Sequence, residues 1–173
     1  MFRRNDKGDA PGPNVYQMKQ KMLSIGDDFW IENGAGQRVF KVDGKALRIR
    51  KTLHLQDAAG NDRYLIKEKL VTVRDVMTIE TEAGPVATVK KALISPLRER
   101  YNVEHADGAE WKVQGNIVDH QYEIEGPAGK IAEVGKKWFR VRDTYGVQVA
   151  PGQDDALVLA VTIVVDSMSH PAR

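Results

Sequence analysis

The sequence predicts a mainly β fold, a closed twelve-stranded antiparallel barrel of six hairpins around a central hydrophobic C-terminal helix. Two observations carry this prediction. Glycines recur every 24 residues, at positions 36, 60, 84 and 108, and apolar residues alternate with polar ones on both sides of each glycine. Near the C-terminus, residues 156–165 form a ten-residue apolar run that only Thr162 interrupts. Alternation is typical of half-buried strands, whereas a helix that is apolar on every side belongs in a core.

Each predicted hairpin consists of a strand, a glycine-bearing turn and a second strand. Two apolar residues stand seven and five positions before glycines 36, 60, 84, 108, 129 and 146: Phe29/Ile31, Leu53/Leu55, Met77/Ile79, Tyr101/Val103, Tyr122/Ile124 and Phe139/Val141. Beyond the turns, the alternation resumes at Leu65, Val89, Val113 and Val134. The first hairpin differs, because Phe40 and Val42 predict a second arm slipped by one residue and a bulge near residues 33–36. Closing the strands into a barrel removes exposed sheet edges.

A barrel of twelve strands is too wide for its own side chains to fill, since about eight strands already close the interior. We expect a helix over about residues 154–168 to occupy it, with Asp154 and Asp155 as the N-cap and acidic first turn. Such a helix is about 22 Å long, comparable with the height of the barrel. The alternative is a thirteenth strand, because the segment is rich in valine and isoleucine.

Three segments, residues 16–21, 24–31 and 42–47, together with this strand and helix pattern, resemble the LURP-one-related family over about residues 14–170. That family is similar to the tubby C-terminal domain and the phospholipid scramblases, and the resemblance implies their twelve-stranded barrel around a hydrophobic helix. It also implies a lipid-associated role, since tubby domains are phosphoinositide-binding adaptors. No lipid-binding motif transfers residue by residue. Scramblases carry palmitoylated cysteines before the barrel, whereas this chain has none, which argues against a scramblase role.

Composition narrows the classes of function. The chain has no cysteine, which excludes thiolate metal sites and disulfides. Residues 1–13 lack the apolar core of a secretory signal, so we expect a disordered N-terminal tail before a single domain at 14–170. The apolar run is half the length of a membrane span. We therefore expect a cytoplasmic protein, and any association with a membrane is expected to be peripheral.

No motif points to catalysis. The four histidines, His54, His105, His120 and His170, show no metal-ligand spacing, and the sequence has neither a nucleophile elbow nor a phosphate-binding loop. We therefore expect no catalytic residues, no cofactor and no metal. Residues 136–142 interleave aromatic and basic side chains, but we interpret them as a strand with Phe139 inward and Arg140 and Arg142 outward. No nucleic-acid partner is expected.

The charge pattern indicates a binding surface. The net charge is only +2, yet the glycine turns sum to about −7 and the connections between hairpins to about +8. An up-and-down barrel places these two sets at opposite rims. The candidate anionic-ligand residues of the basic rim are Arg48, Arg50, Lys51, Lys90, Lys91, Arg98, Arg100, Lys136 and Lys137.

Three functions follow from this pattern. The first is a non-enzymatic binding or adaptor module whose basic rim recognises anionic phospholipid headgroups at a membrane surface. The alternative is a structural or regulatory domain that binds an unidentified protein and no lipid. A small-molecule carrier requires an empty barrel, which the apolar run opposes. We also expect the basic rim to seat Asp154 and Asp155 at the start of the helix.

Overall fold

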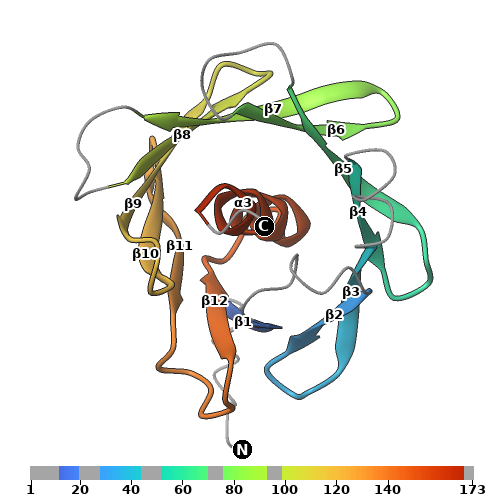
Figure 1. Ribbon diagram of the computed structural model, residues 1–173, viewed down its shortest axis with the longest axis vertical. Coiled ribbons are helices and arrows are strands. Elements are labelled where there is room, and N and C mark those ends of the chain that lie inside the picture. Colours follow the sequence, from blue (N-terminus) through green and yellow to red (C-terminus); the bar gives the residue numbers. More distant parts are fainter. Residues whose placement is uncertain (1–11, 20–27, 44–51, 70–75, 93–98, 170–173) are drawn as a thin grey trace, which may run out of the picture.

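Twelve antiparallel strands close into one barrel around a helix that lies along its axis (Figure 1). The computed structural model describes residues 12–19, 28–43, 52–69, 76–92 and 99–169, and every structural statement below concerns these residues. The strands are β1 Asn14–Lys19, β2 Phe29–Asn33, β3 Arg38–Asp43, β4 Thr52–Asp57, β5 Asp62–Glu68, β6 Val76–Thr81, β7 Gly84–Ala92, β8 Arg100–His105, β9 Glu110–Asn116, β10 Gln121–Gly126, β11 Gly129–Gly135 and β12 Thr144–Val149. The helix α3 is Asp155–Ser169. The predicted fold is confirmed.

Five glycine turns lie where the sequence predicts them, between β2 and β3, β4 and β5, β6 and β7, β8 and β9, and β10 and β11. Gly36 and Gly60 have φ values of 78° and 89°, a left-handed conformation that side chains disfavour. At the second turn, the Asp57 carboxylate accepts hydrogen bonds from the backbone N–H groups of Ala59 and Asn61, at 2.9 and 3.0 Å. These five hairpins therefore follow from local turn chemistry.

The sixth predicted hairpin is wrong. Gly146 lies inside β12, residues 139–143 form a loop, and Val141 is 58% exposed. The strand that completes the twelve is β1, which pairs with β12 from Asn14↔Val149 to Lys19↔Thr144. The barrel is closed by this pairing of its first and last strands, which no pattern of neighbouring residues can reveal.

The predicted slip in the first hairpin is confirmed, because the β2–β3 register shifts between Ile31 and Glu32. The same irregularity occurs between Leu55 and Gln56 in β4–β5. It turns Tyr64 and Ile66 into the barrel and leaves Leu65 on the outer face, so the inward prediction for Leu65 is wrong. A bulge changes which residues face inward, since strand side chains alternate with a period of two.

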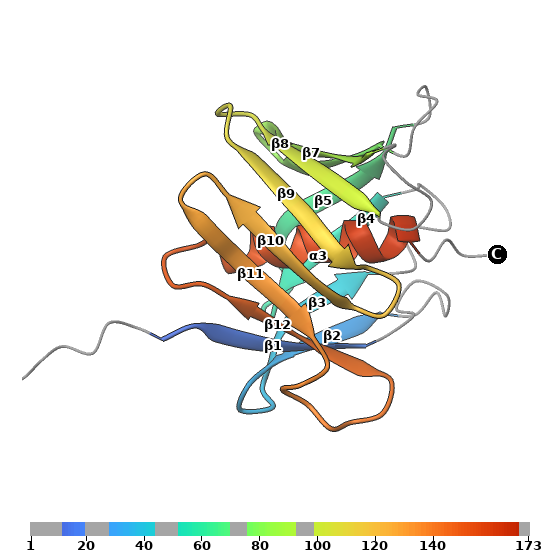
Figure 2. The same ribbon diagram turned by 90° about the vertical axis from the view of Figure 1, so that its left-hand side faces the viewer.

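The helix α3 fills the barrel interior (Figure 2). Val158 through Val161 and Ile163 through Val165 are fully buried, and Asp154 caps the first turn by accepting a hydrogen bond from the N–H of Leu157 at 3.1 Å. The predicted helix is confirmed, and the thirteenth strand is wrong. Within the described ranges, no helix has both the length and the hydropathy to cross a bilayer.

The barrel has two different rims. The turn rim carries the five glycine turns, and the connection rim carries the strand ends that the other connections join, including the described loops 117–120 and 136–143. Because β12 runs from the connection rim to the turn rim, α3 begins at the turn rim. There, Tyr16 and Tyr64 donate hydrogen bonds to Asp155 and Asp154. The expectation that the basic rim seats these aspartates is therefore wrong, and the misplaced sixth hairpin is the reason.

Candidate functional site

The connection rim is the candidate binding surface. The excess charge of the described residues is negative at the turn rim and positive at the connection rim. Acidic side chains gather at the turn rim: Asp57, Asp62, Glu80, Glu82, Glu104, Asp107 and Glu110. The described part of the connection rim includes these basic residues: Lys69, Lys91, Arg100, Lys136, Lys137, Arg140 and Arg142. It also carries Asp43, Glu68, Glu99, Asp119 and Asp143, and the turn rim carries Arg38, Arg63 and Lys130. Among the described residues, the excess charge is therefore acidic at the turn rim and basic at the connection rim.

The structure separates the predicted rim residues into several groups. Arg48, Arg50, Lys51 and Arg98 lie outside the described residues. Lys90 lies on the outer wall, where its ammonium is 3.0 Å from the Glu104 carboxylate on the neighbouring strand. Such an exposed pair contributes little to stability, but it directs the Lys90 charge along the wall, away from the rim.

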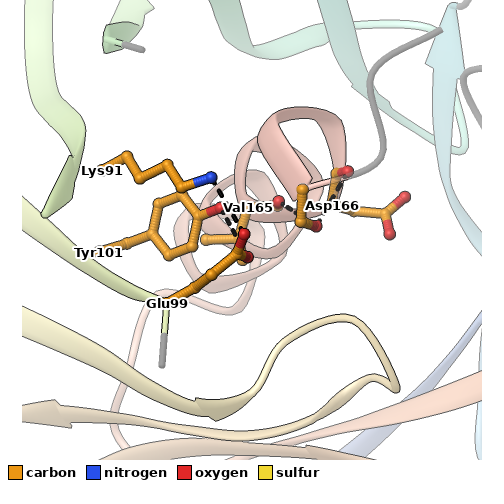
Figure 3. Close-up of polar contacts among 6 residues, drawn as sticks. Lys91, Glu99, Tyr101, Val165 and Asp166 are labelled. Carbon is orange, nitrogen blue, oxygen red and sulfur yellow. Dashed lines mark hydrogen bonds and ion pairs between the residues drawn. The ribbon is translucent and has the colours of Figure 1, made fainter. Parts of the chain in front are cut away.

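Lys91 belongs to a polar cluster beside the last turns of α3 (Figure 3). Its ammonium lies 3.0 Å from one Glu99 oxygen, and the Tyr101 hydroxyl lies 3.4 Å from the other. Lys91 and Glu99 are both about 30% exposed. The Glu99 carboxylate therefore compensates the Lys91 charge. Lys91 stabilises the rim, and an external anion would have to compete with Glu99 for it.

Arg100, Lys136 and Lys137 lie on the exposed surface of the rim. Lys137 pairs with Glu133 at 2.7 Å and its ammonium lies 4.8 Å from the centre of the Trp138 ring, a cation–π contact. Arg100 and Lys136 are exposed and form no ion pair with another described residue. Of the predicted set, these two are the best placed to meet an external anion.

The loop 136–143 folds back over the outer wall, because β11 and β12 present no side chains there. Gly135 and Gly146 are paired and face outward. Trp138 and Phe139 cover them so closely that a Cβ added at Gly146 would lie 2.8 Å from the Trp138 ring. The predictions of a strand here and of an inward Phe139 are therefore wrong.

The same loop projects four consecutive residues into solvent: Arg140, Val141, Arg142 and Asp143. The Arg142 side chain is 94% exposed and lies 3.9 Å from Asp143. Val141 is 58% exposed, and Val118 in loop 117–120 is 57% exposed. Among the described residues, these two valines are the exposed large hydrophobics, and both lie at the connection rim.

Beneath the rim, a buried polar pair joins the wall to α3. Nε2 of His120 lies 2.7 Å from Oδ1 of Asp166, and the imidazole stacks on the Tyr145 ring at 4.3 Å. Burial, with a smaller contribution from the Asp166 charge, raises the pKa of Tyr145. The His120–Asp166 pair is buried from solvent. In the described part of the chain, no three His, Asp or Glu side chains are arranged to hold a metal ion.

A hollow of about 550 Å³ lies on the outer wall beside loop 136–143. Gln114, Gln121, Glu123 and Glu133 line it together with Lys136 and Lys137. Glu123 pairs with Lys130 at 2.6 Å, and Glu133 pairs with Lys137. Because two carboxylates and two ammonium groups line it, the hollow has no net positive charge that would favour an anion.

Comparison with known proteins agrees with this architecture. The family model described as LURP-one-related matches residues 14–166. The chain belongs to the LURP-one-related family. A crystal structure of a protein from Arabidopsis thaliana is similar to it, with a TM-score of 0.69 and 17% sequence identity over 93% of this chain and 94% of that chain. At this identity the likeness concerns the fold. No curated protein matches the chain.

In this LURP-one-related barrel, Arg140 and Arg142 are exposed as the sequence predicts, but they lie in a loop and not in a strand. The sequence pattern did not predict the exposure of Val118 and Val141, and for Val141 the reason is that the alternation of residues 136–142 is also that of a strand. The absence of a side chain at both Gly135 and Gly146 was the available signal, because paired glycines on an outer wall permit another segment to approach closely.

Proposed function

We propose that this LURP-one-related barrel is a non-enzymatic binding module whose connection rim docks on anionic phospholipid headgroups at a membrane surface. The observation that carries the proposal is the separation of charge between the two rims, acidic at the glycine turns and basic at the connections. An anionic bilayer attracts the connection rim and repels the turn rim. The same field therefore binds the protein and orients it.

The interior of the barrel supports surface binding over transport of a small molecule. The axis is occupied by α3, and its residues from Ala156 to Asp166 are buried. A ligand must therefore be met outside. Arg100 and Lys136, exposed and without an ion pair to another described residue, are the donors that we assign to lipid phosphates.

Co-sedimentation with vesicles tests the proposal. We expect the protein to pellet with phosphatidylcholine vesicles that contain phosphatidylserine, and not with phosphatidylcholine alone. A Debye length of about 8 Å at physiological ionic strength means that added salt must weaken the binding. Equal and negligible pelleting with both vesicles would contradict the proposal and favour the alternative, a protein-interaction domain with no lipid ligand.

Charge reversal locates the surface. Near an anionic bilayer each basic residue contributes about 1 kcal/mol, so Arg100→Glu with Lys136→Glu is expected to lower binding by at least roughly tenfold. Arg63→Glu is the matched control, since Arg63 is exposed at the turn rim. Equal loss from both reversals would mean that net charge, rather than this rim, drives the binding.

A further inference from the structure

Two valines at the connection rim suggest how the barrel meets a membrane. A single exposed hydrophobic residue is ordinary on a protein surface. Here Val118 and Val141 lie in loops that follow one another around one rim, 117–120 between β9 and β10 and 136–143 between β11 and β12. The second loop contains four basic residues and one acid. Val141 lies between two arginines, and an apolar tip among basic residues suits the boundary between headgroups and acyl chains, which the apolar tip Val118 of the neighbouring loop would share.

The loop around Val118 is held in shape by its own hydrogen bonds. Asn116 donates from its side-chain amide to Asp119 at 2.7 Å, and the His120 N–H donates to the Ile117 carbonyl at 3.1 Å. Ile117 is buried, and the His120–Asp166 contact anchors the end of the loop to α3. Val118 is the one apolar residue of this loop that points into solvent, so its exposure is built into the loop.

The loop around Val141 is anchored equally well. Trp138 and Phe139 pack on the wall over Gly146, and the Thr144 hydroxyl donates to the Val141 carbonyl at 2.7 Å. These contacts hold the backbone on both sides of the tip. Val141 therefore cannot relieve its exposure by packing on the barrel without breaking them.

We infer that Val118 and Val141 are membrane-inserting tips, which enter the interfacial layer of an anionic bilayer while Arg140 and Arg142 bind lipid phosphates beside them. The inference rests on the proposed function and adds to it an apolar contact and an orientation. The partner is a bilayer surface of net negative charge, because its phosphates can bind the two arginines while its interfacial layer takes up the two valines. Two acids lie beside the tips: Asp119, which accepts a hydrogen bond from Asn116, and Asp143, which is 78% exposed and lies 3.9 Å from Arg142.

The absence of cysteine permits a direct test. Val118→Cys and Val141→Cys each provide one labelling position for an environment-sensitive fluorophore. Leu65→Cys is the control, because Leu65 lies on the outer wall within β5, away from both loops. With phosphatidylserine-containing vesicles, we expect the emission of a fluorophore at position 118 or 141 to shift to the blue. The emission of a fluorophore at position 65 should not shift.

Two unlabelled variants extend the test. Replacing both valines by serine is expected to weaken vesicle binding about tenfold, because the apolar area that the bilayer would bury is lost. Replacing Leu65 by serine should leave binding unchanged, and circular dichroism checks that each variant is folded. Arg140→Gln with Arg142→Gln should reduce the difference between anionic and neutral vesicles in the fluorescence of the Val141→Cys protein, while Arg100 and Lys136 remain.

The outcomes are distinguishable. If the unsubstituted protein pellets with anionic vesicles but neither labelled position shifts, the tips do not insert and this inference is overturned, whereas the proposed function stands. If the unsubstituted protein does not pellet, both are overturned. An equal shift with neutral vesicles would remove the role of the two arginines and overturn the inference as stated.

Discussion

His120 and Asp166, 46 residues apart in the sequence, meet beneath the connection rim with 2.7 Å between Nε2 and Oδ1. Their exposed fractions are 5% and 4%. His120 ends the loop that carries Val118 and has a left-handed backbone with φ of 54°, whereas Asp166 lies in the last turns of α3. This contact joins the helix to the barrel wall at the rim where the chain is proposed to bind.

Removing the carboxylate tests how much this contact stabilises the fold. Asp166→Ala removes the carboxylate that lies against the buried Nε2 of His120, so we expect the free energy of unfolding to fall by about 1–3 kcal/mol. Urea denaturation followed by circular dichroism measures it. Glu82→Ala is the control, since that side chain is exposed in the β6–β7 turn, and its effect should be within about 0.5 kcal/mol. Equal midpoints for the two variants would contradict the prediction.

The barrel axis gives a second prediction. Val161 is fully buried at the centre of α3, so Val161→Asp would place an unpaired charge in the core and should prevent folding. Val161→Ala only removes methyl groups and should leave a folded protein about 1–3 kcal/mol less stable. Thermal unfolding compares the two. A Val161→Asp protein with the original midpoint would show that the helix does not lie in the core.

The close approach of loop 136–143 gives a matched pair of glycine variants. Gly146→Ala places a methyl group 2.8 Å from Trp138, which must displace the loop, whereas Gly135→Ala places one at 3.5 Å, an ordinary contact. We expect Trp138 fluorescence to shift to the red in the first variant and to stay unchanged in the second. The same response from both would mean that Trp138 does not rest on Gly146.

High pH should destabilise the protein. Burial, followed by the hydrogen bonds and charges of Asp155 and Asp154, raises the pKa of Tyr16 and Tyr64. The folded state therefore retains these protons when the unfolded chain begins to lose them near pH 10, and stability falls as pH rises beyond that point. Near-ultraviolet titration of tyrosinate, run with urea unfolding, measures it. Ordinary titration of all five tyrosines in the folded protein is the contrary result.

We expect mild acid to destabilise the protein through protonation of His105. Burial lowers the pKa of His105, and the Asp107 charge partly opposes this shift. The His105 ring packs on Trp111 at 4.2 Å, and its buried Nε2 has no hydrogen-bond partner among the described residues. The unfolded chain binds this proton first, so stability present above about pH 6.5 is lost as pH falls below it. His105→Phe should reduce the difference in urea midpoint between pH 7.5 and 5.5. An unchanged difference would assign the pH dependence to other groups.

Local pattern predicts much of this fold because strand and helix faces repeat over a few residues. Leu53 and Leu55 face inward, as their alternation requires, and Asp154 caps a helix that is buried along nearly its whole length. The bulge between Leu55 and Gln56 was missed, because a one-residue change of register leaves no mark in composition. Leu65 therefore faces outward against the predicted alternation.

The candidate site depends on relationships between distant segments. The basic character of the connections is legible in the sequence, yet which lysines remain exposed is decided by neighbours across the sheet, such as Glu104 beside Lys90. Val141, Arg140 and Arg142 point into solvent because Trp138 packs on the outer wall over Gly146 and holds the loop there.

By itself, the sequence determined the strands and turns of five hairpins, the buried helix and the family, since these depend on periodicity and on residue type. Only the tertiary structure decided that β1 closes the barrel against β12, that α3 enters from the turn rim, and that loop 136–143 lies outside the wall. The physical reason is barrel closure. Closure pairs β1 with β12, which come from opposite ends of the chain. It thereby determines the end of the barrel at which β12 ends and α3 begins.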